Sequence, residues 1–228
     1  MVRLCVIVLY PIYTLLFRIR YRNLERVPAA GGAILAANHN SYADTVFMAR
    51  LVWQAGRIPR FLIKSSLFSR PLLGGLLRRT QQIPVSRGSV DAGQSLHEAK
   101  AALDRGECVL IYPEGTITQN PDWWPMRAKT GVARLALMAP DVPVLPIGQW
   151  GTQFTLDIRR QRFRPFPRKT ATASVGRPVD LGAYRGAEPT ADLLRSMTDE
   201  IMRAITAELA EVRGEPAPPR PDDVEPAA

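Results

Sequence analysis

The sequence predicts an α/β fold, with a mixed, largely buried sheet flanked by helices, in a single domain that follows an N-terminal apolar helix. Three observations support this prediction. Short apolar runs alternate with longer segments of helical character along most of the chain. Hydrophobic residues make up 46% of the 228 residues, which is normal for a globular protein. A chain of this length can also bury a sizeable core within one domain.

The expected strands are short apolar runs, and the expected helices are longer segments with an apolar face. We expect strands at Ala33–Ala37, Phe61–Ile63, Gln82–Val85, Cys108–Tyr112, Val144–Ile147 and Ala171–Val175. We expect helices at Tyr42–Ala55, Leu67–Arg79, Val90–Asp104, Ala128–Met138 and Ala191–Val212. The leucines of the second helix form one stripe, which either belongs to the core or contacts lipid.

The N-terminal segment, residues 1–21, is expected to associate with a membrane. Residues Leu4 to Phe17 carry no charge, but this stretch is shorter than the roughly 20 residues that span a bilayer, and Pro11 interrupts it. Arginines follow at positions 18, 20 and 22 instead of a signal-peptide cleavage site. An interfacial helix on the cytoplasmic face of the cell membrane is therefore expected, and a core helix is the alternative.

The rest of the chain divides into a folded domain and a tail. We expect one domain at 22–212, with its motifs at about 33–150, and a disordered tail at 213–228 that is rich in proline and acidic residues. The net charge is +9, and the tail, with two arginines and four acids, contributes −2, so the remainder carries +11. This excess favours an anionic partner: a phosphate-bearing substrate, an anionic membrane surface or nucleic acid. Cys5 and Cys108 lie in apolar runs and show neither metal-ligand nor disulfide spacing.

The segment from Asn38 to Asp44 holds the strongest functional candidates. It follows the apolar run Ala33–Ala37, so His39 and Asp44 are expected at the end of a buried strand. A histidine oriented by a carboxylate can serve as a general base, and the chain has only two histidines. Ser41 and Asp44 also fit a capping box at the start of a helix, so Asp44 has a structural alternative.

Three further blocks follow in order along the chain. They are Gln82-Ile-Pro-Val-Ser-Arg87, Tyr112-Pro-Glu-Gly-Thr116 and Val142-Pro-Val-Leu-Pro-Ile147. Together with the His39–Asp44 box, they resemble the four ordered blocks of the glycerolipid acyltransferases, the family that includes 1-acyl-sn-glycerol-3-phosphate acyltransferase (lysophosphatidic acid acyltransferase). The resemblance covers roughly residues 22 to 150.

The resemblance implies an O-acyltransferase of phospholipid biosynthesis. It would move a fatty acyl group from acyl-CoA or acyl carrier protein to 1-acylglycerol 3-phosphate, with no other cofactor and no metal. His39 would be the base and Asp44 its partner, and the thioester donor makes an acyl-enzyme unnecessary. Substrate contacts are expected from Arg87, which would hold the acceptor's phosphate, and from Glu114, Gly115 and Thr116. Lys64, Arg127 and Lys129 are weaker candidates for substrate binding.

One position departs from the family pattern. The third block usually continues with Arg and Ser, whereas this chain has Ile117 and Thr118. The departure removes an expected phosphate-binding cation and leaves other acceptors open: glycerol 3-phosphate, another lysophospholipid or a glycolipid.

Two further features bear on alternatives. Five arginines and Lys169 are interleaved with two phenylalanines between residues 159 and 169. This pattern suits an anionic lipid surface or, alternatively, an ordinary solvated loop, and nucleic acid is not expected as a partner. A non-catalytic basic protein that binds anionic membranes or nucleic acid would explain this charge, but not the four blocks. His97 has no motif around it and is expected to be exposed.

Overall fold

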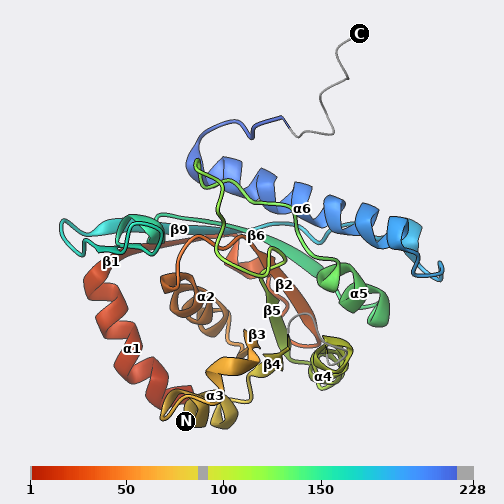
Figure 1. The fold of residues 1–228 in the computed structure, drawn as a ribbon, viewed down its shortest axis with the longest axis horizontal. Helices are drawn as coiled ribbons and strands as arrows, with labels where there is room; N and C mark the ends of the chain where they lie inside the picture. The colour runs from red at the N-terminus through yellow and green to blue at the C-terminus, as the bar shows by residue number, and fades with distance from the viewer. Residues whose placement is uncertain (1, 87–91, 220–228) are drawn as a thin grey trace.

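The computed structural model describes residues 2–86 and 92–219. Its centre is a seven-stranded sheet, which Figure 1 shows in the middle of the molecule. The order of strands across the sheet is β1-β9-β6-β2-β5-β3-β4. The strands are β1 (Phe17–Arg22), β2 (Ala33–Ala37), β3 (Pro59–Lys64), β4 (Ile83–Val85), β5 (Cys108–Ile111), β6 (Val144–Trp150) and β9 (Lys169–Val175). Strands β2 to β6 are mutually parallel, and β9 pairs antiparallel with β6. The predicted mixed α/β sheet is thus confirmed.

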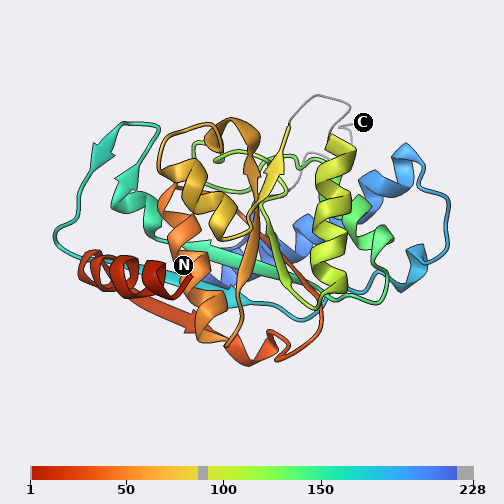
Figure 2. The ribbon, with the colours of Figure 1, turned by 90° about the horizontal axis from the view of Figure 1, so that it is seen from below.

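Helices cover both faces of this sheet. They are α1 (Val2–Leu16), α2 (Ala43–Gln54), α3 (Leu73–Arg79), α4 (Ala92–Asp104), α5 (Gly131–Met138) and α6 (Ala191–Arg213). Side chains of α1 and α2 share one hydrophobic core with the sheet, and side chains of α4, α5 and α6 share the other. Figure 2 shows α1 and α2 in front of the strands, and Figure 1 shows α6 along the opposite face.

The central strand shows how the sequence produces this arrangement. All five residues of β2 are buried, and their side chains alternate between the two faces because a strand has a period of two. Ile34 packs in the core beneath α4 to α6, whereas Leu35 packs in the core beneath α1 and α2. A continuous apolar run is therefore the expected pattern for a parallel strand that is covered on both sides.

The long helix α6 lies directly on β6 at Gly148. A β-carbon at Gly148 would come within 2.2 Å of the backbone nitrogen of Leu209, so only glycine allows this approach. Helix α6 begins after Thr190, whose hydroxyl accepts a bond from the Leu193 N–H, and it ends at Gly214 in the left-handed conformation.

Two predicted segments differ from the structure. Phe17–Arg22, which the sequence analysis assigned to the apolar segment and its arginine flank, is an edge strand paired with β9, and its alternate residues are exposed. The predicted helix at Leu67–Arg79 is interrupted: Leu72 has a φ of 61° and is 93% exposed, and α3 begins only at Leu73. Pro71 disfavours a helical conformation at Arg70, the residue before it, so one continuous helix from Leu67 to Arg79 is not favoured. No helix within the described residues is long and apolar enough to cross a membrane.

Candidate active site

The parallel strands bring the predicted site residues to one edge of the sheet. His39 follows the end of β2, Glu114 follows the end of β5, and Lys64 is the last residue of β3. Because β2, β3 and β5 are parallel, their carboxyl ends meet at the same edge, where α/β proteins bind their ligands. Arg87, the predicted phosphate ligand, lies outside the described residues.

His39 and Asp44 are in direct contact. Nδ1 of His39 lies 3.0 Å from Oδ2 of Asp44, and the imidazole ring stacks on Tyr112 with the ring centroids 4.1 Å apart. The Asp44 side chain is fully buried, whereas that of His39 is 12% exposed. In a neutral imidazole that donates to this carboxylate, the proton is on Nδ1 and the free lone pair is on Nε2. The pair is therefore competent to accept a proton at Nε2. His97 is exposed on α4, as expected.

Asp44 combines the two roles that the sequence left open. Its Oδ2 also accepts bonds from the backbone N–H groups of Asn40, at 2.6 Å, and of Ser41, at 2.9 Å. The bond from Ser41 is the one that an acidic residue makes in a capping box. The hydroxyl of Ser41 accepts from the Ala43 N–H at 3.3 Å. One carboxylate thus caps α2 and holds the His39 ring.

Asp44 has a fourth partner, which could not be predicted from the sequence. The hydroxyl of Thr152, which is 1% exposed, donates a hydrogen bond to Oδ1 of Asp44. Thr152 follows the end of β6, the strand next to β2, and therefore reaches the same edge of the sheet. It lies just beyond the fourth block, and no local pattern marks it as a partner of a residue so distant in sequence.

Glu114 is turned away from solvent and braces the turn. It is 3% exposed, and its Oε1 accepts the His39 N–H at 3.1 Å while its Oε2 accepts the Met126 N–H at 2.9 Å. Burial raises the pKa of Glu114 to about 7, against the opposing effect of these two backbone bonds. From its motif, Glu114 is predicted to contact a substrate. In the structure, the Glu114 carboxylate links the backbone of His39 to the backbone of Met126.

The remaining substrate candidates surround the same turn. Gly115 has a φ of 72°, and its N–H donates to the carbonyl of Tyr112 at 2.9 Å, so the turn itself uses the N–H that was expected to face a substrate. Thr116 and Lys64 are exposed. Cδ of Lys129 lies 3.4 Å from the place that a β-carbon on Gly115 would occupy, so this exposed lysine side chain passes over the turn.

Ile117 is only 6% exposed. The position where the family usually has an arginine therefore contributes an apolar side chain to the interior of this protein. Any cation that holds an acceptor's phosphate must come from elsewhere in the chain.

The segment after the Glu114 turn is held by contacts with His39 and with the end of α6. The Thr118 N–H donates to the His39 carbonyl at 2.8 Å, and the Thr118 hydroxyl donates to the carbonyl of Trp124 at 2.8 Å. The guanidinium of Arg213, the last residue of α6, lies 4.1 Å from the ring centroid of Trp124 and 4.2 Å from that of Trp150. Such cation–π contacts are favourable, so the end of α6 holds this segment in place.

Comparison with known proteins identifies the family. The family model described as Acyltransferase matches residues 18–150, more than half of the chain. The 1-acyl-sn-glycerol-3-phosphate acyltransferase of Bacillus subtilis is 23% identical over 208 residues, covering 90% of this chain and 95% of that protein. The N-acylphosphatidylethanolamine synthase of Arabidopsis thaliana is 30% identical over 118 residues, covering 50% of this chain and 41% of that protein.

The fold is shared with a solved structure. The 1-acyl-sn-glycerophosphate (LPA) acyltransferase PlsC of Thermotoga maritima superimposes with a TM-score of 0.62 at 22% identity, covering 90% of this chain and 76% of that chain. The match over residues 18–150 includes the His39–Asp44 pair and the Glu114 turn, and it confirms the prediction of an O-acyltransferase. The chain belongs to the acyltransferase family, as its resemblance to the glycerolipid acyltransferases predicted.

Proposed function

We propose that this acyltransferase moves a fatty acyl group from an acyl thioester to the free hydroxyl of 1-acylglycerol 3-phosphate, which yields phosphatidic acid. The observation that carries the proposal is the His39–Asp44 pair at the carboxyl edge of the sheet, with Nδ1 and Oδ2 3.0 Å apart. The name of the Bacillus subtilis relative, which aligns over almost its whole length, supports the same acceptor.

The proposed mechanism needs one base and no acyl-enzyme. Nε2 of His39 takes the proton of the acceptor hydroxyl as its oxygen attacks the thioester carbonyl carbon. The buried carboxylate of Asp44 stabilises the imidazolium that forms. The tetrahedral intermediate then collapses, the carbon–sulfur bond breaks, and the imidazolium returns the proton to the departing thiolate. The products are the ester and the free thiol of coenzyme A or of the carrier protein.

The acceptor's phosphate requires a cation near this pair. Because Ile117 is buried and uncharged, we propose that Lys129, which passes over Gly115, and Lys64, at the end of β3, hold the phosphate together with Arg87. The same observation at Ile117 favours a second candidate, in which the chemistry is unchanged and the acceptor is glycerol 3-phosphate, another lysophospholipid or a glycolipid.

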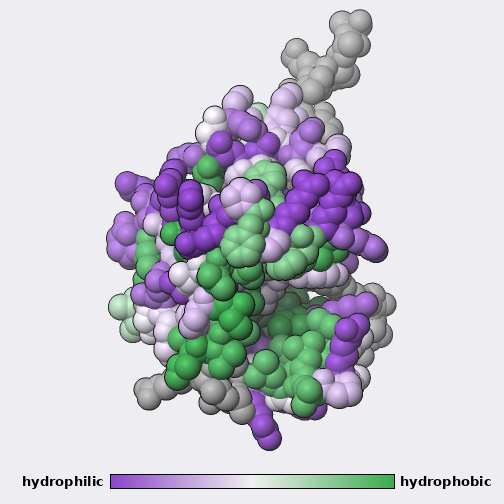
Figure 3. All heavy atoms as spheres, turned by 90° about the vertical axis from the view of Figure 1, so that its left-hand side faces the viewer, coloured by the Kyte–Doolittle hydropathy of each residue, from purple (hydrophilic) through white to green (hydrophobic). Residues whose placement is uncertain are grey.

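We also propose that the enzyme works at the cytoplasmic face of the cell membrane, on an anionic surface. The support is an apolar area on one side of the molecule. Figure 3 shows hydrophobic side chains gathered on the lower half of this side, where α1 and α3 lie, with hydrophilic ones above. Phe163 and Phe166, in the arginine-rich segment that includes the hairpin of β7 (Leu156–Asp157) and β8 (Arg162–Phe163), are 60% and 65% exposed.

A transfer assay tests the chemistry. Purified protein is given radiolabelled acyl-CoA and 1-acylglycerol 3-phosphate in mixed micelles, beside the variants His39→Ala and Asp44→Asn. General-base catalysis contributes about 10²- to 10⁴-fold, so His39→Ala should lose activity by that factor. His97→Ala is the matched control, because it removes the other, exposed histidine. Asparagine caps a helix well but is no carboxylate, so full activity in Asp44→Asn would reduce Asp44 to a cap.

A panel of substrates tests the acceptor and the donor. Glycerol 3-phosphate, other lysophospholipids and a glycolipid are compared with 1-acylglycerol 3-phosphate, and acyl carrier protein is compared with coenzyme A. Lys129→Ala should raise KM for the phosphate-bearing acceptor and leave kcat nearly unchanged, whereas Lys100→Ala, at an exposed ion pair on α4, should change neither. Transfer to a different acceptor would favour the second candidate. Transfer to none would favour the binding-protein alternative.

A further inference from the structure

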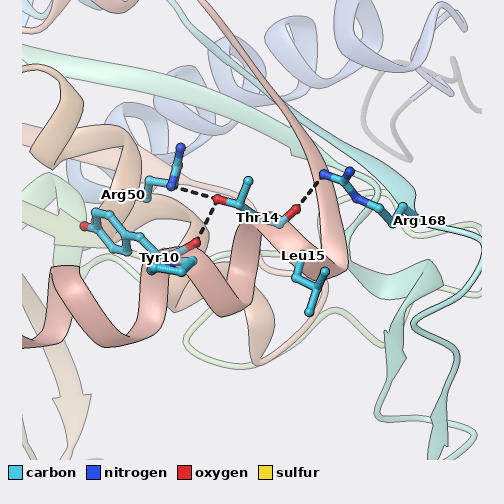
Figure 4. Close-up of a pocket in the computed structure, with 6 residues that line it drawn as sticks. Tyr10, Thr14, Leu15, Arg50 and Arg168 are labelled. Atoms are coloured by element: carbon cyan, nitrogen blue, oxygen red, sulfur yellow. Dashed lines mark hydrogen bonds between the residues drawn. The ribbon is translucent and has the colours of Figure 1, made fainter.

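A shallow pocket lies beside α1, and it shares no residue with the candidate active site. Its volume is about 520 Å³. It is lined by Tyr10, Pro11, Thr14 and Leu15 of α1, by Arg50 of α2 and by Arg168 just before β9. Figure 4 shows the two arginines on either side of Thr14.

The polar side of this pocket is positively charged. Nη1 of Arg50 donates to the Thr14 hydroxyl at 3.1 Å, and Nη2 of Arg168 donates to the carbonyls of Thr14 at 2.5 Å and of Phe17 at 2.7 Å. No acidic residue lines the pocket, and within residues 2–86 and 92–219 neither guanidinium is in an ion pair. Each guanidinium has five N–H donors, so these bonds leave donors for a bound anion.

The surface next to these charges is apolar. On α1, Ile7 is 68% exposed, Ile12 52% and Leu15 63%. Burial of these aliphatic side chains removes apolar surface from water, which favours contact with a lipid phase. With 15 residues, α1 is too short to span a bilayer and suits a position in the interface. A ligand that fits both features is an anion that carries hydrocarbon chains.

We propose that this pocket binds an anionic glycerophospholipid of the membrane. Its headgroup phosphate lies between Arg50 and Arg168, and its acyl chains run along the exposed side chains of α1. The proposal deepens the membrane-surface part of the proposed function and rests on it. It fixes a specific contact that holds α1 in the interface, in addition to the general attraction of a basic surface.

Vesicle flotation tests this site, with vesicles of phosphatidylcholine alone or with phosphatidylglycerol added. A basic residue near an anionic surface contributes about 1 kcal/mol, so Arg50→Gln should weaken binding to the anionic vesicles about fivefold. Arg185→Gln removes the same charge from an exposed arginine near Asp141, and it should weaken binding less than twofold. Equal losses in the two variants would overturn the proposal in favour of a diffuse charge effect.

A second pair of variants keeps both arginines. Thr14 is exposed, so Thr14→Glu places a carboxylate between the two guanidiniums with little risk to the fold, and Thr14→Gln is the neutral control. Thr14→Glu should lose several-fold in affinity for the anionic vesicles, and Thr14→Gln should not. Unchanged binding by Thr14→Glu, or release of the wild-type protein from vesicles by millimolar inorganic phosphate at constant ionic strength, would overturn a lipid site. The readout is vesicle binding, so failure here is distinguishable from a failure of acyl transfer.

Discussion

Replacing Thr152 by valine tests whether the hydrogen bond to Asp44 acts on catalysis or only on stability. Valine has nearly the shape of threonine but lacks the hydroxyl, and both Thr152 and Asp44 are buried, so water cannot replace the lost donor. A hydrogen bond to a charged group contributes about 1.5–3 kcal/mol. If the bond also fixes the carboxylate against His39, the same energy corresponds to a loss of about 10- to 100-fold in kcat.

The assay compares Thr152→Val with Thr152→Ser, which keeps the hydroxyl. For the valine variant we expect kcat to fall and KM for both substrates to stay within about twofold, because Thr152 acts through Asp44 and touches no substrate. Urea unfolding should show a free energy of unfolding that is lower by about 1.5–3 kcal/mol. The serine variant should recover most of kcat. A valine variant with reduced stability and unchanged kcat would refute a positioning role and leave a purely structural bond.

Three further predictions concern the surrounding framework. The free energy of unfolding should fall as the pH rises from about 4.5 to 7, because burial raises the folded-state pKa of Glu114 from 4.5 to about 7. At 1.36 kcal/mol per pH unit, the loss is about 3 kcal/mol. Urea unfolding measured across this pH range should show a weaker dependence of the free energy of unfolding on pH in Glu114→Gln. Gly148→Ala should destabilise the protein by about 3 kcal/mol, because its β-carbon would meet the α6 backbone, whereas Gly131→Ala, which meets nothing within 4 Å, should not. The contacts of Arg213 with Trp124 and Trp150 are called the Arg213 clamp. Arg213→Ala should shift the tryptophan fluorescence emission and lower the free energy of unfolding by about 1–3 kcal/mol. An emission spectrum identical to that of the wild type would contradict the clamp.

Most of the sheet could be predicted because local sequence determines it. The bounds of β2 match the predicted strand, since a run of five apolar residues is typical of a strand that is covered on both faces. Phe17–Arg22 was misassigned although its alternation of aromatic or aliphatic residues with arginine is a typical edge-strand pattern. The arginines suggested a membrane flank, and only pairing with β9, about 150 residues away, makes the segment a strand.

The site was predictable to the extent that its residues are close in the chain. His39 and Asp44 are five residues apart, and the strand-to-helix turn between them returns the carboxylate to the imidazole. Thr152 and the Arg213 clamp depend on contacts between distant segments, so no local pattern marks them. The two backbone bonds that Glu114 accepts could not be predicted, because the motif reveals the residue type but not the direction in which its carboxylate points.

The contacts of Arg213 with Trp124 and Trp150, at the end of α6, have a practical consequence for truncating or tagging the protein. A continuous path of contacts runs from Arg213 through Trp124 and Thr118 to the backbone of His39. A truncation that removes Arg213 would therefore loosen His39, the proposed base, although it removes nothing near His39 in sequence. An affinity tag joined after Glu215 leaves the path intact and keeps the carboxylate that pairs with Arg213. The carboxyl terminus is thus a suitable place to add residues and a poor place to remove them.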